Sequence, residues 1–282
     1  MQTEQFDFNK ERGLGEKIEF TFSFWKENFK VILISILTLV TPFGIVGGGM
    51  TTYVTASMTK GVLTNPMDSD PFAMVANPLF IIGNILIIFS FIMLTSVGTA
   101  IIKVYLENEE LTATKIRESA ISNLRKIFGI SVASYFLIFI GSMAFLIPGI
   151  YLAIGFSLAV PLVVFENASI SEALSKSRKL VSGNWWSTLG YLIVISFIAS
   201  FFGSIISFVG GLFSGVNAES LLSSNGEFSS TYSFVLLTIN FISNLVTPVF
   251  YVIVYFGIVV QYFSLKEQKE ATSILNDVEA MS

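Results

Sequence analysis

The sequence of 282 residues contains no cysteine and no histidine. A chain without thiols cannot form disulfides, and a chain that lacks both residue types cannot build a zinc site from nitrogen or sulfur ligands. Haem ligation through histidine and acid–base catalysis by an imidazole are excluded as well. We therefore expect no metal and no cofactor, and a large share of enzyme mechanisms is ruled out.

Charged residues are also scarce: they make up 13% of the chain, against 53% apolar residues, and the mean hydropathy is +0.74. In soluble domains about a quarter of the residues are charged, so this composition predicts a membrane protein with lipids as its first partners. The net charge of −4 leaves no concentrated basic face of the kind that binds phosphate backbones. We expect no nucleic-acid partner.

Long apolar runs divide the sequence. A helix that crosses a bilayer needs about 20 mainly apolar residues. Such runs lie near residues 29–50, 79–103, 127–147, 149–166, 185–212 and 232–263. The third and fourth are separated by little more than "IPGIY" around Pro148 and Gly149, which predicts a tight hairpin. The expected fold is all-α: a polytopic membrane protein with six transmembrane helices arranged as three hairpins.

The basic residues predict an orientation. Fifteen of the sixteen Lys and Arg residues fall in every second gap between the apolar runs, and only Lys60 lies elsewhere. Basic residues near span ends stay on the cytoplasmic side, so both termini are expected there. The predicted plan is a cytoplasmic segment 1–28, a six-span domain 29–263 and a cytoplasmic tail 264–282. Since the N-terminus lacks the basic-then-apolar pattern of a cleavable signal, we expect the mature chain to begin near Met1.

Apolar residues recur at helical spacing in the inner segments that precede spans one, three and five. The three stripes are Leu14, Ile18, Phe22, Trp25 and Phe29; Ile116, Ala120, Leu124, Ile127 and Phe128; and Ile170, Ala173, Leu174, Ser177 and Val181. Amphipathic helices of this kind lie in the head-group plane. We predict an internal repeat of one cytoplasmic-side interfacial helix and a two-span hairpin. The alternative is that membrane hairpins look alike in general.

Aromatic and basic residues in these segments are candidate interfacial anchors, because tryptophan is enriched at membrane–water interfaces and basic residues fix the cytoplasmic side. They are Trp25, Trp185, Trp186, Arg117, Arg125, Lys126, Arg178 and Lys179.

Residues 147–194 read "IPGIYLAIGFSLAVPLVVFENASISEALSKSRKLVSGNWWSTLGYLIV". The stretch has a Pro-Gly turn, a span with Pro161, an acidic residue at the end of that span and then "SEALSKSRKLVSGNWW". In this order of features it resembles the membrane domain associated with bacterial glycerophosphodiester phosphodiesterases and its stand-alone relatives. The resemblance implies a membrane fold in a bacterial inner membrane. It does not bring hydrolysis, because that chemistry belongs to a separate soluble barrel that uses histidine and metal-binding carboxylates.

Glu166 is the leading candidate for a functional side chain, since it follows the uncharged run "YLAIGFSLAVPLVVF". An ionisable group within a bilayer is costly and marks function by default. The alternative is that Glu166 lies in the head-group zone and pairs with Arg178 or Lys179. After it, "NASISEA" offers Ser169 as the N-cap of the interfacial helix, with Glu172 three residues later.

Two prolines and two asparagines are further candidates for a polar lining. Pro161 and Pro248 lie in spans four and six, and broken helices mark substrate sites in many transporters. Prolines are also common in membrane helices, where neighbours satisfy the backbone. Asn240 and Asn244 are four residues apart and share a face, which suits a polar lining or an inter-helix hydrogen bond.

Small residues form two strips that predict close helix packing. Span five carries Ser196, Ser200, Gly203, Ser204, Ser207 and Gly211, and span one carries Gly44 and Gly48. Small side chains let helix backbones approach closely, against another span or another subunit. A polar permeation lining is the alternative for span five.

The favoured function is a non-enzymatic integral inner-membrane protein that organises or regulates a membrane partner or the local lipid environment. A membrane-protein partner or a homo-oligomer is compatible with this role. The alternative is a transporter or permease subunit for a small or amphipathic solute.

Overall fold

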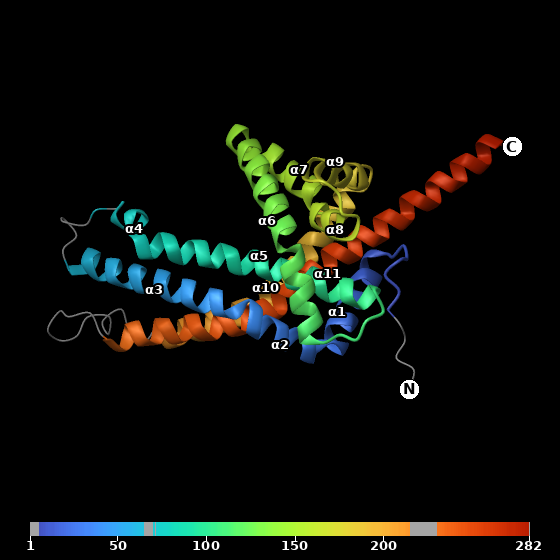
Figure 1. Ribbon diagram of the computed structural model, residues 1–282. Helices are drawn as coiled ribbons and strands as arrows, with labels where there is room; N and C mark the ends of the chain where they lie inside the picture. The colour runs from blue at the N-terminus through green and yellow to red at the C-terminus, as the bar shows by residue number, and fades with distance from the viewer. Residues whose placement is uncertain (1–5, 65–69, 71, 215–229, 282) are drawn as a thin grey trace. The chain divides into compact units, whose positions relative to one another are not determined.

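The computed structural model describes residues 6–64, 70, 72–214 and 230–281, and this part of the chain is helical with no strand (Figure 1). The helices are α1 (Leu14–Glu27), α2 (Phe29–Leu39), α3 (Thr41–Thr64), α4 (Ala73–Ala76), α5 (Pro78–Leu106), α6 (Ala113–Ala144), α7 (Leu146–Phe156), α8 (Ala159–Phe165), α9 (Ile170–Val181), α10 (Trp185–Ser214) and α11 (Ser230–Met281). The expected all-α class is confirmed.

Several of these helices are long and apolar enough to cross a membrane. Within the described residues there are five candidate spans, or six if the bent pair α2 and α3 counts as one. The two members of that pair meet at an angle of 49°. Pro42 lies in the first turn of α3, where a missing N–H costs no helical hydrogen bond. The protein is therefore membrane-embedded, as its composition predicts.

One local feature differs from the sequence-based expectation. The chain turns between α6 and α7 at Phe145, which is extended, and not at Pro148 and Gly149. Pro148 lies inside the first turn of α7, where proline is tolerated. At the other end of the chain, α11 continues as far as Met281, so the predicted tail 264–282 is helical over nearly all of its length.

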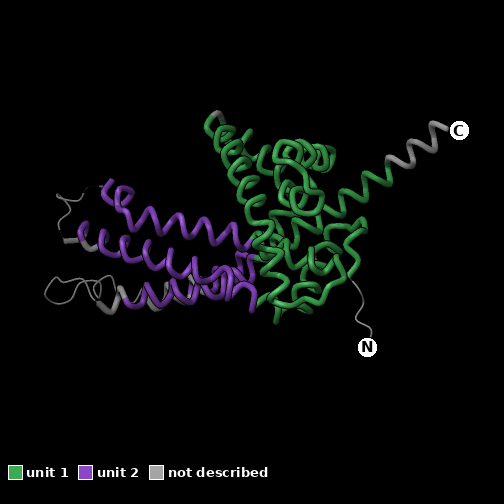
Figure 2. The backbone as a smooth tube through the Cα atoms, in the orientation of Figure 1, with its two compact units in different colours: residues 1–33, 95–198, 252–282 green, residues 34–94, 199–251 purple. Residues whose placement is uncertain are grey.

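The chain forms two compact units (Figure 2). Unit 1 comprises residues 1–33, 95–198 and 252–282, and unit 2 comprises residues 34–94 and 199–251.

Unit 1 is organised around a cluster of aromatic rings that join the N-terminal segment to α1, α5 and α11. The rings belong to Phe6, Phe8, Phe20, Phe24, Tyr105, Phe256 and Phe263, and neighbouring centroids are 5.0 to 6.2 Å apart, mostly edge to face. Edge-to-face pairs add to the stabilisation that burial provides.

The predicted surface helices differ from one another. The first and third are the separate helices α1 and α9, whereas the second is the beginning of the continuous helix α6. In α9 the buried residues are Ala173, Leu174, Ser177 and Val181, which were expected in its apolar stripe. In α6, Asn123 is buried and Phe128 is 51% exposed.

In α1 the buried face is not the expected apolar stripe. It consists of Lys17, Thr21 and Phe24, while Leu14 is 48% exposed. The Lys17 ammonium lies 5.9 Å from the ring centroid of Tyr191. Burial lowers the pKa of Lys17, against the opposing effect of the Glu11 charge. The aromatic cluster decides which side of α1 faces inward, because it holds Phe24.

Candidate functional site

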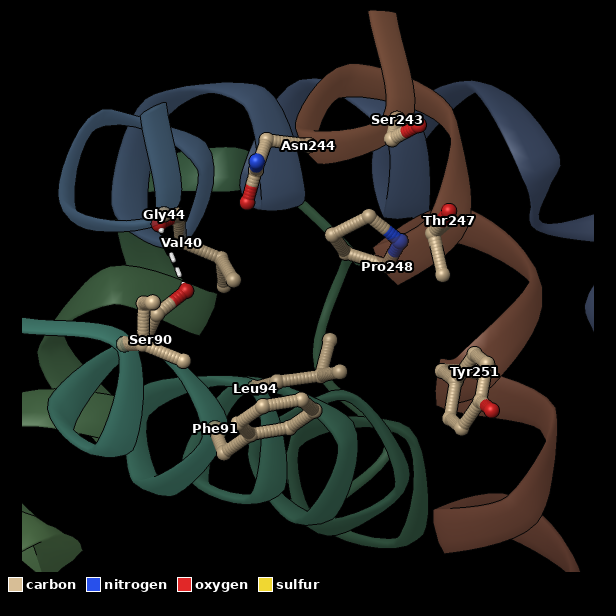
Figure 3. A pocket seen from close by; sticks show the side chains of 11 residues that line it. Val40, Gly44, Ser90, Phe91, Leu94, Ser243, Asn244, Thr247, Pro248 and Tyr251 are labelled. Atoms are coloured by element: carbon tan, nitrogen blue, oxygen red, sulfur yellow. Dashed lines mark hydrogen bonds between the residues drawn. The ribbon is translucent and has the colours of Figure 1, made fainter. Parts of the chain in front are cut away.

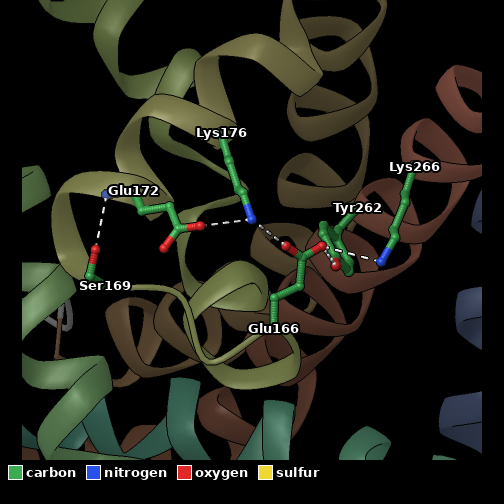
Figure 4. A network of polar contacts seen from close by, with 6 residues as sticks. All are labelled: Glu166, Ser169, Glu172, Lys176, Tyr262 and Lys266. Atoms are coloured by element: carbon green, nitrogen blue, oxygen red, sulfur yellow. Dashed lines mark hydrogen bonds and ion pairs between the residues drawn. The ribbon is translucent and has the colours of Figure 1, made fainter.

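Glu166 lies at the C-terminal end of α8 and binds three side chains from two other helices (Figure 4). Lys176 of α9 is 3.2 Å from Oε2, and Lys266 of α11 is 3.2 Å from Oε1. The hydroxyl of Tyr262, also on α11, donates to Oε1 at 2.7 Å. Since the side chain of Glu166 is 23% exposed, these contacts are partly shielded from solvent. We call this group the Glu166 network.

The partners of Glu166 are not those expected from the sequence. Neither Arg178 nor Lys179 forms the ion pair. The guanidinium of Arg178 lies 5.8 Å from the ring centroid of Phe156, and the carbonyl of Lys179 accepts from Lys269 at 2.5 Å. The partner on α9 is Lys176, which also forms an ion pair with Glu172, one turn earlier, at 2.9 Å.

The N-terminus of α9 orients Lys176. The Ser169 side chain caps this helix by accepting from the N–H of Glu172 at 3.4 Å, so the N-cap predicted from the sequence is confirmed. A cap fixes where a helix begins, and with it the direction in which Lys176 points toward Glu166.

Electrostatics keep Glu166 ionised. Partial burial acts to raise its pKa, but the hydrogen bonds from Tyr262, Lys176 and Lys266, together with the charge of Lys266, hold the pKa below its ordinary value. A carboxylate of this kind is a poor proton donor at neutral pH. The arrangement is therefore suited to joining helices and not to acid–base chemistry.

A second set of contacts joins the end of α9 to α11. The ammonium of Lys269 donates to the carbonyls of Lys179 and Ser182, at 2.5 and 3.1 Å. A cationic side chain is favourable at a helix C-terminus, where carbonyls lack partners. The amide of Asn184 donates to the side chain of Gln268 at 2.9 Å. The C-terminal end of α9 and the residues that follow it are thus attached to α11.

The break between α7 and α8 is bridged by Ser177 of α9. Pro161 lies in the first turn of α8 and has no N–H, so the span containing it cannot be a regular helix through Ser157. The hydroxyl of Ser177 accepts from the N–H of Leu158 at 3.2 Å and donates to the carbonyl of Gly155 at 2.6 Å. The sequence places Ser177 in an apolar stripe but does not reveal this role. The hint that the sequence offers is the presence of a small polar residue within an otherwise apolar stripe.

In unit 2 the structure brings together two features that the sequence shows separately. A Cβ added to Gly44 would lie 2.6 Å from Oδ1 of Asn244, and one added to Gly48 would lie 2.6 Å from Oδ1 of Asn240. The Asn244 amide donates to the carbonyl and to Oδ1 of Asn240, at 2.9 and 3.1 Å. The asparagines of α11 therefore lie against the glycine face of α3.

Next to this contact is a cavity of about 180 Å³ (Figure 3). Its lining includes Asn244, Pro248, Ser90 and Tyr251. Pro248 has no N–H to offer the Asn244 carbonyl. On the side of the cavity opposite Pro248, the hydroxyl of Ser90 donates to the carbonyl of Val40 at 3.1 Å. All of the lining residues belong to unit 2, so Glu166 is not part of this cavity.

The small-residue strip of α10 is divided between environments. Ser200 and the hydroxyl of Tyr251 are 3.1 Å apart, and a Cβ on Gly203 would be 3.4 Å from Thr247. Ser196 is half-buried in unit 1, and Ser204 is exposed. Ser207 and Gly211 lie in α10, at positions whose surroundings are outside the described part of the chain.

Most of the candidate anchors lie at exposed positions. Trp185 stacks on Tyr151, with ring centroids 5.8 Å apart, and Trp186 is 79% exposed. Lys126 donates to the side chain of Asn167 at 2.7 Å. Arg117, Arg125, Arg178 and Lys179 are exposed, whereas Trp25 is half-buried and meets Phe29 edge-on.

A comparison with protein-family models gives one match in residues 127–281, to the membrane domain of glycerophosphoryl diester phosphodiesterase. The matched region runs from α6 to α11 and includes the Glu166 network and Ser177. No curated protein and no solved structure matches the chain. In the part of the chain that the structure describes, no three His, Cys, Asp or Glu residues are grouped as a metal site would require.

Proposed function

Since the chain belongs to the family of the membrane domain of glycerophosphoryl diester phosphodiesterase, we propose that it is a non-enzymatic integral protein of the bacterial inner membrane. In this role it organises or regulates a membrane partner or the local lipid environment. The match concerns a membrane domain, and the phosphodiesterase reaction would need a catalytic domain for which no match was found.

The Glu166 network carries this proposal. The ionisable residue at the end of an apolar span is paired with two lysines and a tyrosine, so its contacts are those of a structural ion pair. An activated acid or base needs a group that can exchange protons near neutral pH. Glu166 does not meet this requirement, because its pKa is lowered and the carboxylate stays ionised near neutral pH.

Because α9 is held in place, its basic side chains have a fixed position near the basic ends of the spans. Contacts through Lys176, Ser177 and Lys269 hold α9 on α8 and α11. The side chains of Arg178 and Lys179 remain exposed on it. Basic groups on a helix that is held in place suit an acidic partner surface or anionic head groups, because the helix loses less conformational freedom when it binds.

The experiment is purification of the full chain in mild detergent, with identification of the lipids and proteins that copurify. Lys179→Gln removes an exposed charge of α9 and leaves the carbonyl that binds Lys269. We expect it to reduce recovery of the bound partner, whereas Lys10→Gln, which removes an exposed charge of the N-terminal segment, leaves recovery unchanged. Turnover of a glycerophosphodiester or a lipid by the purified protein would overturn the proposal.

A second candidate function is a transporter or permease subunit, and the unit 2 cavity is the observation that favours it. Asn244 and Pro248 line this mainly apolar cavity, and spans interrupted at proline mark substrate sites in many transporters. Proteoliposomes that accumulate a solute, and lose the accumulation with Asn244→Leu but not with Thr238→Val on the exposed face of α11, would favour this function.

A further inference from the structure

Unit 1 contains a cavity of about 240 Å³ that borders α5, α6, α7, α8 and α11. Seven of its thirteen lining residues carry a hydroxyl group, including Thr95, Thr99, Ser131, Ser134, Tyr135 and Ser157. None of the lining residues carries a charge. The cavity therefore presents hydroxyl groups on an apolar background, at the place where Pro161 interrupts a span.

Three of these hydroxyls have no hydrogen-bond partner in the part of the chain that the structure describes. They belong to Ser131, Ser134 and Tyr135, which lie on one face of α6 because their spacing is three and four residues. By contrast, Thr99 donates to the carbonyl of Thr95 at 2.9 Å, and Ser157 donates to that of Ile154 at 2.7 Å. A polar group without a partner in an apolar environment is unfavourable. A ligand with hydroxyl groups would supply the missing partners.

The cavity opens on a surface that faces hydrocarbon. Tyr135 lines it and is 71% exposed, and its neighbours on α6, Val132, Phe136 and Phe139, are 51, 62 and 62% exposed. In the most apolar stretch of α6, only 11% of the residues are buried within the protein. A ligand that enters here comes from the bilayer, so it has an apolar part.

One end of the cavity, at Ser131 and Thr99, lies at a depth that suits the glycerol region of a lipid. Ser131 follows Lys126 by five residues, and Thr99 precedes Lys103 by four. At 1.5 Å per residue these separations are about 6–8 Å. The lining thus begins close to the basic ends of the spans, and it extends along α6 to Ser134 and Tyr135, about 12–14 Å from Lys126.

We propose that this cavity binds the uncharged, hydroxyl-bearing head of a glycerol-based neutral lipid such as a diacylglycerol. Its volume is below the roughly 300–1,000 Å³ of sites that enclose a whole drug-sized ligand, so it holds the head and leaves the acyl chains in the bilayer. A phosphate ester is disfavoured, since an ionised group would be desolvated without a cationic partner. This inference rests on the proposed non-enzymatic function, in that the lipid is held and not converted.

The test is native mass spectrometry of the full chain, purified in detergent without glycerol and titrated with dioctanoylglycerol, dioctanoyl phosphatidate or free glycerol. We expect saturable binding of one dioctanoylglycerol, with phosphatidate at least about tenfold weaker. Ser131→Ala and Ser134→Ala should each weaken binding about three- to tenfold, the effect of one hydrogen bond. Ser122→Ala, on an exposed part of the same helix, is the matched control. Ser134→Leu fills the cavity and should abolish binding.

Several results would overturn the inference. These are phosphatidate binding as tight as dioctanoylglycerol binding, equal affinity for free glycerol, or unchanged affinity in the Ser131 and Ser134 variants. Absence of any binding would overturn it and leave the proposed function standing. Conversion of the bound lipid to a product would overturn the proposed function and leave the cavity assignment standing.

Discussion

The hydroxyl of Ser177 accepts a hydrogen bond from the N–H of Leu158 at 3.2 Å. Through this contact a surface helix supplies the partner that a broken membrane span lacks, and the same hydroxyl donates to the carbonyl of Gly155. Within a membrane, backbone groups outside a regular helix must be satisfied by the protein itself. Ser177 therefore couples the position of α9 to the geometry of the break beside the hydroxyl-lined cavity.

Ser177→Ala should destabilise the protein by about 1–3 kcal/mol, because it leaves a buried N–H and a buried carbonyl without partners. The measurement is the midpoint of thermal unfolding of the detergent-purified chain. Ser171→Ala, at an exposed position of the same helix, should leave the midpoint unchanged. Equal midpoints for the two variants would show that the bridge contributes nothing.

Glu166→Gln should destabilise the protein by about 1.5–3 kcal/mol, since Lys176 and Lys266 both lose a charged acceptor. Glu172→Gln is the matched control, because it removes the other, exposed partner of Lys176 and should leave the midpoint close to that of the native chain. Thermal unfolding of both variants checks the difference. A larger loss for the Glu172 variant would contradict the central place of Glu166.

Acid should remove the contribution of Glu166 to stability. Its pKa in the folded protein lies below the ordinary value of 4.5. A carboxyl with a lowered pKa stabilises the fold above its ordinary pKa and loses that contribution as the pH falls through its folded pKa. Unfolding midpoints measured from neutral pH downward should therefore converge for the native chain and Glu166→Gln at acidic pH. A difference that persists in acid would refute this linkage.

Gly44→Ala and Gly48→Ala should each destabilise unit 2 by about 1–2 kcal/mol, because overpacking outweighs the gain in helix propensity. The new methyl groups would displace Asn244 and Asn240. Gly49→Ala provides the control on the same helix, since nothing lies within 4 Å of its added Cβ. Unfolding measurements should show Gly49→Ala as neutral or slightly stabilising, and the reverse order would exclude close packing at Gly44 and Gly48.

The absence of cysteine allows a direct test of orientation with single introduced thiols. Arg125→Cys and Lys179→Cys should react with a membrane-impermeant maleimide only from the cytoplasmic side, and Asp70→Cys only from the opposite side, because basic segments stay inside. Labelling of intact cells and of inverted vesicles gives the comparison. Reaction of Lys179→Cys in intact cells would reverse the predicted orientation.

The partners within the candidate sites show why sequence patterns reach only part of the structure. The cap at Ser169 and the buried face of α9 depend on residues close together in the chain, and helical periodicity predicted both. The pairing of Glu166 with Lys266 joins residues 100 positions apart. The expected partners, Arg178 and Lys179, were wrong because proximity in sequence does not fix which helices pack together. For the same reason Lys17 lies outside the predicted apolar stripe of α1 and is nevertheless buried.

Composition, hydropathy and local spacing were enough to predict a helical, membrane-embedded protein, because these signals act over a few helical turns, and the motif order in residues 147–194 was enough to indicate a relative of a phosphodiesterase membrane domain. Which polar groups meet became clear from the folded chain: Glu166 with α9 and α11, Asn240 and Asn244 with the glycines of α3, and Ser177 with the broken span. These contacts depend on the packing of helices distant in sequence, where the need to satisfy each buried polar group selects one partner among several.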